Sequence, residues 1–183
     1  MASGDDEFEQ LFDAVYPQLC RFLDHLLGGR GADEDIAQEA FLRLHRLGAG
    51  RPPAGEARYW LFGVARNLAL NELGRRRTRE RWRVRVAGLF GLRAPNPEEC
   101  LATDERRRMI RAWLGALTEH QRAALLLREQ AGMSYREIAR VLDVSEAKVK
   151  VDIFRARSAL RAKWRHMEGA DDVSVHRENL PAR

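Results

Sequence analysis

The side chains in this sequence that are best suited to chemistry are cations gathered near residue 150. Lys148, Lys150, Arg155 and Arg157 follow Ser145, whose hydroxyl is suited to cap the start of a helix. Ammonium and guanidinium groups donate hydrogen bonds to phosphate oxygens and to base edges in the major groove of DNA. The cluster therefore predicts binding to a nucleic acid, with an ordinary solvated basic face of a helix as the alternative.

Two further helix starts precede this cluster and position it. Thr118 with Gln121, and Ser134 with Glu137, have the spacing of capping boxes, in which each side chain satisfies a backbone N–H of the other residue. Apolar residues then recur at helical spacing on both sides of a short break, which predicts a helix-turn-helix whose second helix carries the cations. These apolar residues are Ile138, Ala139, Leu142, Val144, Val149, Ile153 and Leu160.

The charge distribution favours a polyanionic partner and a chain of two parts. The chain has 183 residues and a net charge of +5, with an isoelectric point near 9.7. Residues 1–47 carry a net charge of −6, whereas residues 48–100 and 101–168 each carry +6. Cationic surfaces bind nucleic acids because each neutralised phosphate releases condensed counterions. No apolar run approaches the roughly 20 residues of a spanning helix and the acidic start is unlike a signal peptide, so we expect a cytoplasmic protein without membrane insertion.

Metal and catalytic motifs are missing from the sequence. Cys20 and Cys100 belong to no C-x-x-C pair and predict two ordinary reduced thiols. His25 follows Cys20 closely, but no further histidine or cysteine at ligand spacing completes a zinc site. The fingerprints of hydrolases, zinc proteases, P-loop proteins and dinucleotide-binding proteins are also absent. We therefore expect no catalytic residues, no bound metal and no cofactor.

Helical periodicity runs through almost the whole chain and predicts an all-α protein. Apolar residues within the range 8–27 indicate a first helix, with Pro17 as a kink or as a boundary between two shorter helices. A second helix is predicted over residues 33–47. A third begins near Glu56, after a loop rich in glycine and proline, and passes into a run of arginines.

Two small helical domains follow from this pattern. We predict an N-terminal bundle of three to four helices in residues 5–83 and a C-terminal helix-turn-helix domain in residues 102–166. Residues 84–101, which include glycines and prolines, would form a flexible linker between the domains. Residues 167–183 are polar and would form a disordered tail.

Three motifs resemble those of the extracytoplasmic-function, or group IV, sigma factors of bacterial RNA polymerase. Residues 34–41 are similar to the E-D-x-x-Q-E-x-F of the family's polymerase-binding helix. Residues 60–67 resemble the W-L-x-x-I-A-x-N helix that reads the minus-ten promoter element, with Val64 in place of Ile. Residues 133–139 resemble the L-S-Y-x-E-I-A of the domain that binds the minus-thirty-five element, with Met133 in place of Leu. The resemblance covers nearly the whole chain.

The resemblance implies that the second helix binds core RNA polymerase, whose β and β′ subunits would be partners of this protein. In the family this helix docks on the coiled coil of β′, and the matching positions are Asp35, Gln38, Glu39 and Arg43. The alternative is that these charges only cap and solvate the helix. That alternative suits Gln38 and Glu39 less well, because they flank the apolar stripe.

The resemblance also implies a surface that reads the minus-ten element. In the family, the loop at residues 47–59 captures an unstacked base with Asn67 beneath it, and an amide can both donate to a base and accept from it. The alternative for Asn67 is a buried amide bonded to nearby backbone. A dense run of arginines then extends the third helix as a phosphate-binding edge. The residues assigned to this surface are Tyr59, Asn67, Arg75, Arg76, Arg77 and Arg79.

The helix-turn-helix would place its second helix in the major groove of the minus-thirty-five element. Asp152 departs from the family's G-T-V-K-S-R pattern, so that its carboxylate would either accept from a cytosine or orient Arg155 or Arg136. Val151 departs as well, and its side chain suits a thymine methyl. The promoter sequence therefore stays open. The residues assigned to this surface are Ser145, Lys148, Lys150, Val151, Phe154, Arg155 and Arg157.

Three other positions depart from the family pattern. Gly63 stands where most relatives have Arg or Lys, and Ala32 stands where a further Asp is common. Asp143 occupies the turn of the helix-turn-helix, where Gly is common. Aspartate tolerates the left-handed backbone conformation better than most residues, so we expect the turn to be kept.

Together these patterns predict an alternative sigma factor that binds core RNA polymerase, directs promoter-specific transcription initiation and is not an enzyme. The resemblance further implies an anti-sigma factor that inserts between the two domains. A stand-alone helix-turn-helix transcriptional regulator is the alternative, and it would bind duplex DNA without polymerase. A third reading is a sigma mimic that only titrates an anti-sigma factor, and the two basic surfaces count against it.

Overall fold

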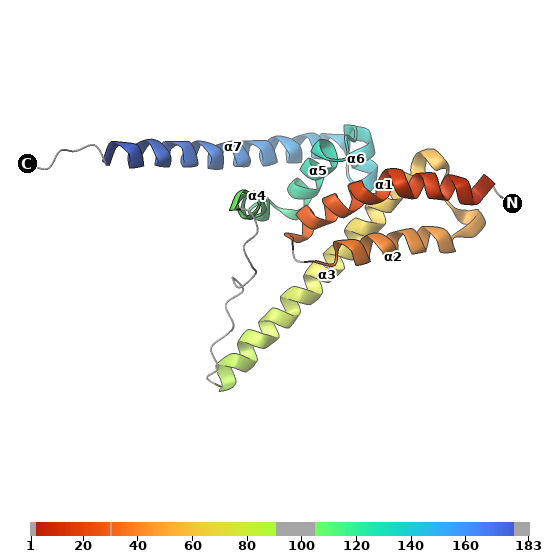
Figure 1. The fold of residues 1–183 in the computed structure, drawn as a ribbon, viewed down its shortest axis with the longest axis horizontal. Coiled ribbons are helices and arrows are strands. Elements are labelled where there is room, and N and C mark those ends of the chain that lie inside the picture. Colours follow the sequence, from red (N-terminus) through yellow and green to blue (C-terminus); the bar gives the residue numbers. More distant parts are fainter. Residues whose placement is uncertain (1–2, 30, 91–104, 178–183) are drawn as a thin grey trace, which may run out of the picture.

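Every regular element that the computed structural model describes, over residues 3–29, 31–90 and 105–177, is a helix (Figure 1). The all-α fold predicted from the sequence is therefore confirmed. The elements are α1 (Ser3–Leu27), α2 (Asp33–Arg46), the 3₁₀ helix η1 (Gly48–Gly50), α3 (Ala54–Phe90), α4 (Glu105–Gly115), α5 (Glu119–Glu129), α6 (Tyr135–Leu142) and α7 (Glu146–Arg177).

Helices α1, α2 and α3 form the N-terminal bundle, in which each helix packs on the other two. Aromatic rings fill the space between them. Phe22 of α1 meets Phe62 of α3 edge-on, with 5.4 Å between the ring centroids. Phe41 of α2 meets Phe12 of α1 in the same manner at 4.9 Å. This interlocking of large rings fixes the three helices relative to one another.

Pro17 does not divide the first helix. α1 continues from Ser3 to Leu27 with Pro17 inside it, so the predicted boundary between two shorter helices is wrong. Proline lacks the N–H that would bond to the carbonyl of Asp13. Both residues are exposed, so water can satisfy that carbonyl and the helix continues.

Helices α4 to α7 form the C-terminal domain and contain the predicted helix-turn-helix. Both predicted capping boxes are present, one between Thr118 and Gln121 and the other between Ser134 and Glu137. Asp143 ends α6 in the left-handed conformation, with φ 53° and ψ 53°, as expected for the turn. α7 then packs on α5 and α6.

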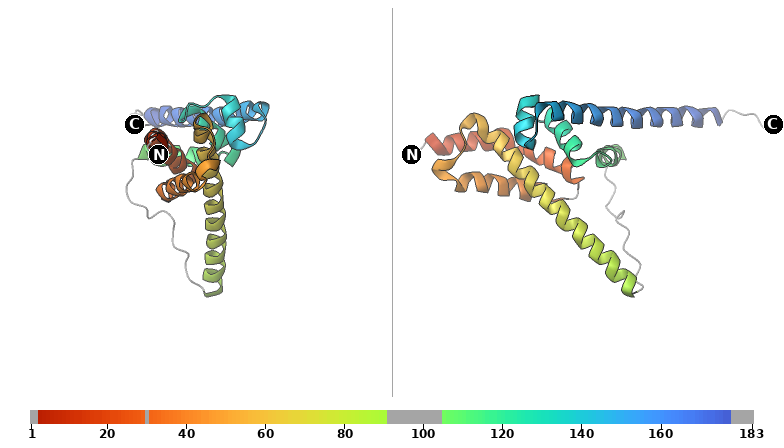
Figure 2. Two further views of the ribbon diagram at one scale, coloured as in Figure 1. Left: turned by 90° about the vertical axis from the view of Figure 1, so that its right-hand side faces the viewer. Right: turned by 180° about the vertical axis from the view of Figure 1, so that it is seen from behind.

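The far ends of α3 and α7 project from the packed part of the molecule in different directions (Figure 2). α3 runs to Phe90, into the range 84–101 predicted as a linker, of which residues 91–101 lie outside the described ranges. α7 runs to Arg177, so part of the predicted tail 167–183 is helical. Arginine is a good helix former, which lets α3 continue although Arg75, Arg77 and Arg79 are exposed.

The two domains pack directly on each other. α1 contacts α4 and α5, and α3 contacts α6; in Figure 1, α6 lies beside the crossing of α1 and α3. Buried apolar side chains of both domains form one continuous cluster. The sequence predicted the two domains but not this closed arrangement.

Ala32 offers a test of how α2 is held. It precedes α2 in the left-handed conformation, with φ 89° and ψ 1°, and supplies no side-chain cap. That conformation costs a residue with a Cβ roughly 1–2 kcal/mol. We expect Ala32→Gly to raise the free energy of unfolding by about 0.5–1 kcal/mol, once glycine's larger entropy in the unfolded chain is subtracted. Thermal denaturation would measure it.

The matched control is Ala14→Gly, at an exposed site inside α1 of the same bundle. Glycine inside a helix costs about 1 kcal/mol relative to alanine, so this variant should melt at a lower temperature. Equal destabilisation by both substitutions would contradict the account of Ala32.

Candidate nucleic-acid interface

The recognition surface lies at the start of α7. The hydroxyl of Ser145 accepts a hydrogen bond from the backbone N–H of Lys148 at 3.2 Å, so Ser145 caps the helix as the sequence predicted. One side of the helix is buried through Val149, Ile153 and Ala156. The opposite side is open to solvent and to DNA. Its exposed residues include Lys150, Val151, Phe154, Arg155 and Arg157.

Lys148 is held by a carboxylate of its own helix. Its Nζ lies 2.6 Å from each carboxylate oxygen of Asp152, one turn further along. Asp152 is only 2% exposed, whereas the side chain of Lys148 is 48% exposed. A carboxylate buried in this way cannot reach a cytosine, and it bonds to Lys148 rather than to Arg155 or Arg136. Both sequence interpretations of Asp152 are therefore wrong.

The other cations of the recognition surface differ in their partners. Arg157 donates a hydrogen bond to Glu129 of α5 at 2.6 Å, which raises the pKa of Arg157. Lys150 places its Nζ 5.8 Å from the centre of the Tyr135 ring, a cation–π contact. Phe154 is 67% exposed beside these cations. The surface thus combines charge with an exposed aromatic ring, which suits contacts with both phosphates and base methyl groups.

The second basic surface follows α3. Asn67 is exposed, so its alternative interpretation as a buried amide is wrong. Arg76 differs from the other arginines of this run, because it pairs with Glu72 at 2.6 Å and donates to the carbonyl of Gly31 at 3.1 Å. Arg76 therefore braces the segment that leads into α2. The exposed members of the minus-ten set are Asn67, Arg75, Arg77 and Arg79.

The loop before α3 is shorter than the predicted base-capturing loop at residues 47–59. η1 occupies Gly48–Gly50 and α3 already begins at Ala54. Arg51 anchors the remaining turn, with its guanidinium 5.0 Å from the centre of the Phe8 ring and its Nη2 3.0 Å from Nδ1 of His45. The turn is thereby tied to α1 and α2.

Tyr59 points from α3 toward the second domain. Its hydroxyl donates a hydrogen bond to the carboxylate of Glu137 on α6. This bond raises the pKa of Tyr59, and together with hydrogen bonds from Ser134 it lowers the pKa of Glu137. A residue assigned to the minus-ten surface is therefore engaged by the helix-turn-helix in the closed arrangement.

Further polar contacts between the domains were missed by the sequence reasoning, and with Tyr59 they form what we call the interdomain seam. Arg66 donates from Nε and Nη2 to the two carboxylate oxygens of Glu119, each at 2.8 Å, and is 8% exposed. Arg58 donates to the carbonyl of Ala131. The seam also contains Arg122 with the Leu26 carbonyl at 2.9 Å, Arg111 with Asp24 at 3.5 Å, Arg140 with Glu56 at 3.6 Å, and Gln130 with His25 at 3.1 Å.

Gly63 lies where α3 meets α6. A Cβ at this position would lie 3.7 Å from the backbone carbonyl oxygen of Val141, an ordinary contact distance. The Arg or Lys of the family pattern has a much longer side chain, which would extend toward the second domain. The absence of a side chain at Gly63 is therefore compatible with the closed arrangement.

The candidate polymerase-binding surface is the exposed side of α2. Asp35 and Gln38 are exposed, and Glu39 pairs with Arg43 at 2.8 Å, a hydrogen bond that lowers the pKa of Glu39. The sequence reasoning missed Leu42, which is 49% exposed one turn after Gln38. The sequence could have indicated this exposed leucine, because Leu42 lies outside the apolar stripe of the helix. An exposed leucine beside polar residues is suited to a protein interface.

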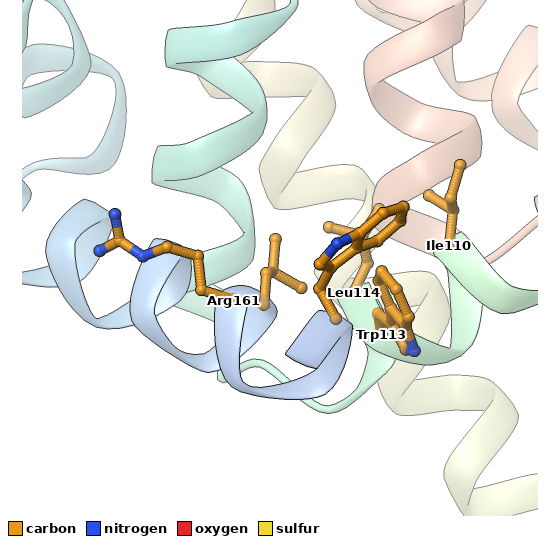
Figure 3. A pocket seen from close by; sticks show the side chains of 6 residues that line it. Ile110, Trp113, Leu114 and Arg161 are labelled. Atoms are coloured by element: carbon orange, nitrogen blue, oxygen red, sulfur yellow. The ribbon is translucent and has the colours of Figure 1, made fainter. Parts of the chain in front are cut away.

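An open apolar hollow of about 310 Å³ lies between α4 and α7 (Figure 3). Trp113 and Trp164 meet there edge-on, with 6.0 Å between the ring centroids. Such a lining brings together no set of polar groups of the kind that catalysis requires. The hollow is lined by Ile110, Trp113, Leu114, Leu160, Arg161 and Trp164.

Other kinds of site find little support in the described residues. Within them, no group of histidine, cysteine and carboxylate side chains is arranged to hold a metal ion. No helix in this part of the chain is both long and apolar enough to cross a lipid bilayer. Cys20 is a free thiol whose burial raises its pKa, which makes it a poor nucleophile.

Family models match both domains. Residues 11–79 match the model of sigma-70 region 2, and residues 107–160 match the model of sigma-70 region 4. The fold and the two basic surfaces thus define a two-domain sigma factor of RNA polymerase. More particularly, the chain belongs to the extracytoplasmic-function (ECF) RNA polymerase sigma factors.

Three relatives support this assignment. The ECF RNA polymerase sigma-E factor of Escherichia coli (strain K12) is 34% identical over 140 residues, which cover 70% of this chain and 72% of that protein. The RNA polymerase sigma-H factor of Pseudomonas aeruginosa is 36% identical over 136 residues, which cover 69% of this chain and 70% of that protein. The ECF sigma factor SigX of Bacillus subtilis (strain 168) is 29% identical over 171 residues, which cover 90% of this chain and 85% of that protein.

Two solved structures share the fold. The sigma factor RpoE of Bartonella quintana, solved with the anti-sigma factor NepR, has a TM-score of 0.65 at 24% identity over 85% of this chain and 94% of that chain. CnrH, solved with the cytosolic domain of CnrY, has a TM-score of 0.62 at 24% identity over 87% of this chain and 88% of that chain. The chain is thus a regulatory protein, an alternative sigma factor that binds core RNA polymerase and promoter DNA and directs transcription initiation.

Gly63 provides a test of the closed arrangement. Ala fits at 3.7 Å from the Val141 carbonyl and removes a helix-interior glycine, so Gly63→Ala should keep the domains closed and raise stability by about 1 kcal/mol. Gly63→Arg should instead force α3 and α6 apart. Small-angle scattering of the free protein should then show a larger radius of gyration for Gly63→Arg than for Gly63→Ala. An identical radius for both variants would contradict the arrangement.

Proposed function

We propose that this sigma factor reads its promoter with two surfaces on separate domains, residues 5–83 and 102–166, joined by residues 84–101 and followed by a tail at residues 167–183. The observation that carries the proposal is that each domain exposes a basic surface on one helix, α3 in the first domain and α7 in the second. The minus-ten element would contact Tyr59, Asn67, Arg75, Arg76, Arg77 and Arg79. The minus-thirty-five element would contact Ser145, Lys148, Lys150, Val151, Phe154, Arg155 and Arg157.

Promoter binding then requires the interdomain seam to open. The two elements are about 25 base pairs apart, which is roughly 85 Å of B-form DNA at about 3.4 Å per base pair. In the closed arrangement α3 and α6 are in direct contact, and we infer that the two surfaces cannot then reach both elements. Opening would release Tyr59 from Glu137 and Arg66 from Glu119. The Tyr59 hydroxyl and the Arg66 guanidinium would then be free to donate hydrogen bonds to DNA.

Binding to core polymerase is assigned to the exposed side of α2. Asp35, Gln38, Glu39 and Arg43 would contact the β′ subunit, and we add Leu42 to this set. A leucine that is 49% exposed next to polar residues supplies apolar area that a partner can bury. The ion pair between Glu39 and Arg43 would hold the polar rim of the contact in place.

We further infer that an anti-sigma factor regulates this protein. The Bartonella quintana sigma factor, which shares the fold, was solved with such a partner. The interdomain seam supports the inference, because its hydrogen bonds and ion pairs can be exchanged for those of another protein. The partner would hold the two domains away from their promoter geometry.

The protein acts by binding rather than by catalysis in this proposal. Its site of action is the bacterial cytoplasm, where polymerase and chromosomal DNA are found. A stand-alone regulator is less well supported, because it would need neither the polar surface of α2 nor a second basic surface on α3.

The proposal predicts specific initiation in a reconstituted system. Core RNA polymerase with the full chain should start transcription at defined promoters, and the triple variant Arg75→Ala, Arg77→Ala, Arg79→Ala should weaken promoter binding. Each lost phosphate contact lowers the slope of log affinity against log salt by about 0.7–0.9. The triple variant should therefore lose about two to three units of slope in filter-binding experiments at several salt concentrations.

The control is the variant Arg161→Ala, Lys163→Ala, Arg165→Ala, which removes the same charge from a more distant part of α7 and should leave the slope nearly unchanged. An unchanged slope in the Arg75 to Arg79 variant would refute the phosphate role. Tight binding of duplex DNA by the protein alone, without association with polymerase, would support the stand-alone regulator instead.

Leu42 yields a separate prediction about polymerase. Leu42→Glu places a charge in the proposed contact and should weaken binding to core polymerase about tenfold or more, equivalent to about 1.4 kcal/mol. Leu47→Glu is the matched control, because Leu47 is similarly exposed (41%) at the end of the same helix but lies about 140° away around its axis. Fluorescence titration of core polymerase would measure both. Equal affinity of the two variants would remove Leu42 from the contact.

A further inference from the structure

Lys148 and Asp152 form an ion pair on α7 that has no role in the promoter contacts proposed above. They lie one turn apart at the start of α7, where recognition helices contact base edges. Both carboxylate oxygens of Asp152 lie 2.6 Å from the Lys148 ammonium. The carboxylate is buried and the lysine is half exposed. The pair therefore presents one exposed cation on a buried anchor.

The anchor changes what the lysine can bind. A lysine without a partner has a flexible stem and acts as a mobile point charge toward phosphates. Here a buried carboxylate fixes the position of the ammonium, and its negative charge disfavours an approaching phosphate. Two of the three N–H donors of the ammonium are directed at the carboxylate. One donor remains in a fixed place, which suits a single neutral acceptor better than a phosphate.

The acceptor that fits is a guanine. In the major groove guanine presents O6 and N7, both acceptors, and lysine is one of its most common partners. Adenine and thymine each offer one acceptor there, beside an amino group and a methyl group respectively, and cytosine offers a donor. An ammonium held at the first turn of the recognition helix meets an acceptor at either of two guanine atoms, whereas on adenine or thymine the single acceptor lies beside an amino or a methyl group.

We propose that Lys148 is a specificity-determining residue that donates to a guanine of the minus-thirty-five element, and that Asp152 is the positioning residue that holds it there. The proposal rests on the promoter-reading role given above for α7. It adds the base that is read at one position and a residue, Asp152, that acts through another.

The test uses holoenzyme assembled from core polymerase and the full chain. A promoter library with a fixed minus-ten element and a randomised minus-thirty-five element is transcribed, and the products are sequenced. The wild-type protein should enrich guanine at one position. Lys148→Met and Asp152→Asn should each reduce that enrichment about tenfold, while the preference at the other positions is kept. Lys150→Met should lower total output without changing any base preference.

A structural role of the pair is separated by a second variant. Lys148→Met with Asp152→Leu removes both charges and fills the buried position of Asp152 with an apolar side chain, a replacement that commonly preserves folding. This double variant should remain active in polymerase binding and still lose the guanine preference. Retention of the preference in Lys148→Met, in Asp152→Asn or in the double variant would overturn the proposal.

The outcomes also distinguish this proposal from the one on which it rests. If wild-type holoenzyme initiates at no specific promoter, the proposed function of the two surfaces fails. If initiation is specific but the wild type shows no guanine preference that depends on Lys148, the inference about the pair fails alone.

Discussion

Burying a charged side chain is costly unless it is paired with a group of opposite charge, and Arg66 meets this condition across the boundary between the two domains. Its guanidinium bonds both oxygens of Glu119, so burial of the arginine and closure of the domains are one event. The other contacts of the interdomain seam are also hydrogen bonds and ion pairs. Water can replace each of these polar contacts when the domains separate, whereas the apolar cluster that the domains share favours the closed arrangement.

The same donors would serve in the closed and in the open state. Tyr59 and Arg66 lie on α3, the helix to which the minus-ten contacts are assigned, and in the closed state their acceptors are the carboxylates of Glu137 and Glu119. A carboxylate is an anionic oxygen acceptor, as a phosphate is. In this scheme the second domain occupies donors that DNA would otherwise use, so closure and promoter binding exclude each other. Gly63 allows the close approach, because a long side chain there would extend toward α6.

The sequence predicted local structure well because local structure depends on neighbouring residues. The two capping boxes, the Ser145 cap and the turn at Asp143 all involve residues at most five apart, and all are present. Interactions between distant residues were not predictable in this way. Arg66 and Glu119 are 53 residues apart, and the sequence pattern of neither helix indicates that the two side chains form a pair. The cations of α7 were assigned from their type and spacing, and the other site residues from the family resemblance. Neither source predicted which side chains pair with one another.

Asp152 shows why single departures from a family pattern are hard to interpret. Taken alone, an aspartate on a recognition helix suggested a base contact or an anchor for a neighbouring arginine. Its neighbour Lys148 also departs from the pattern, and the two departures compensate each other, because a lysine and an aspartate four residues apart on a helix attract each other. On this helix the two departures form one ion pair, so neither residue can be interpreted without the other. Specificity therefore has to be derived from side-chain pairs in the folded helix rather than from one position at a time.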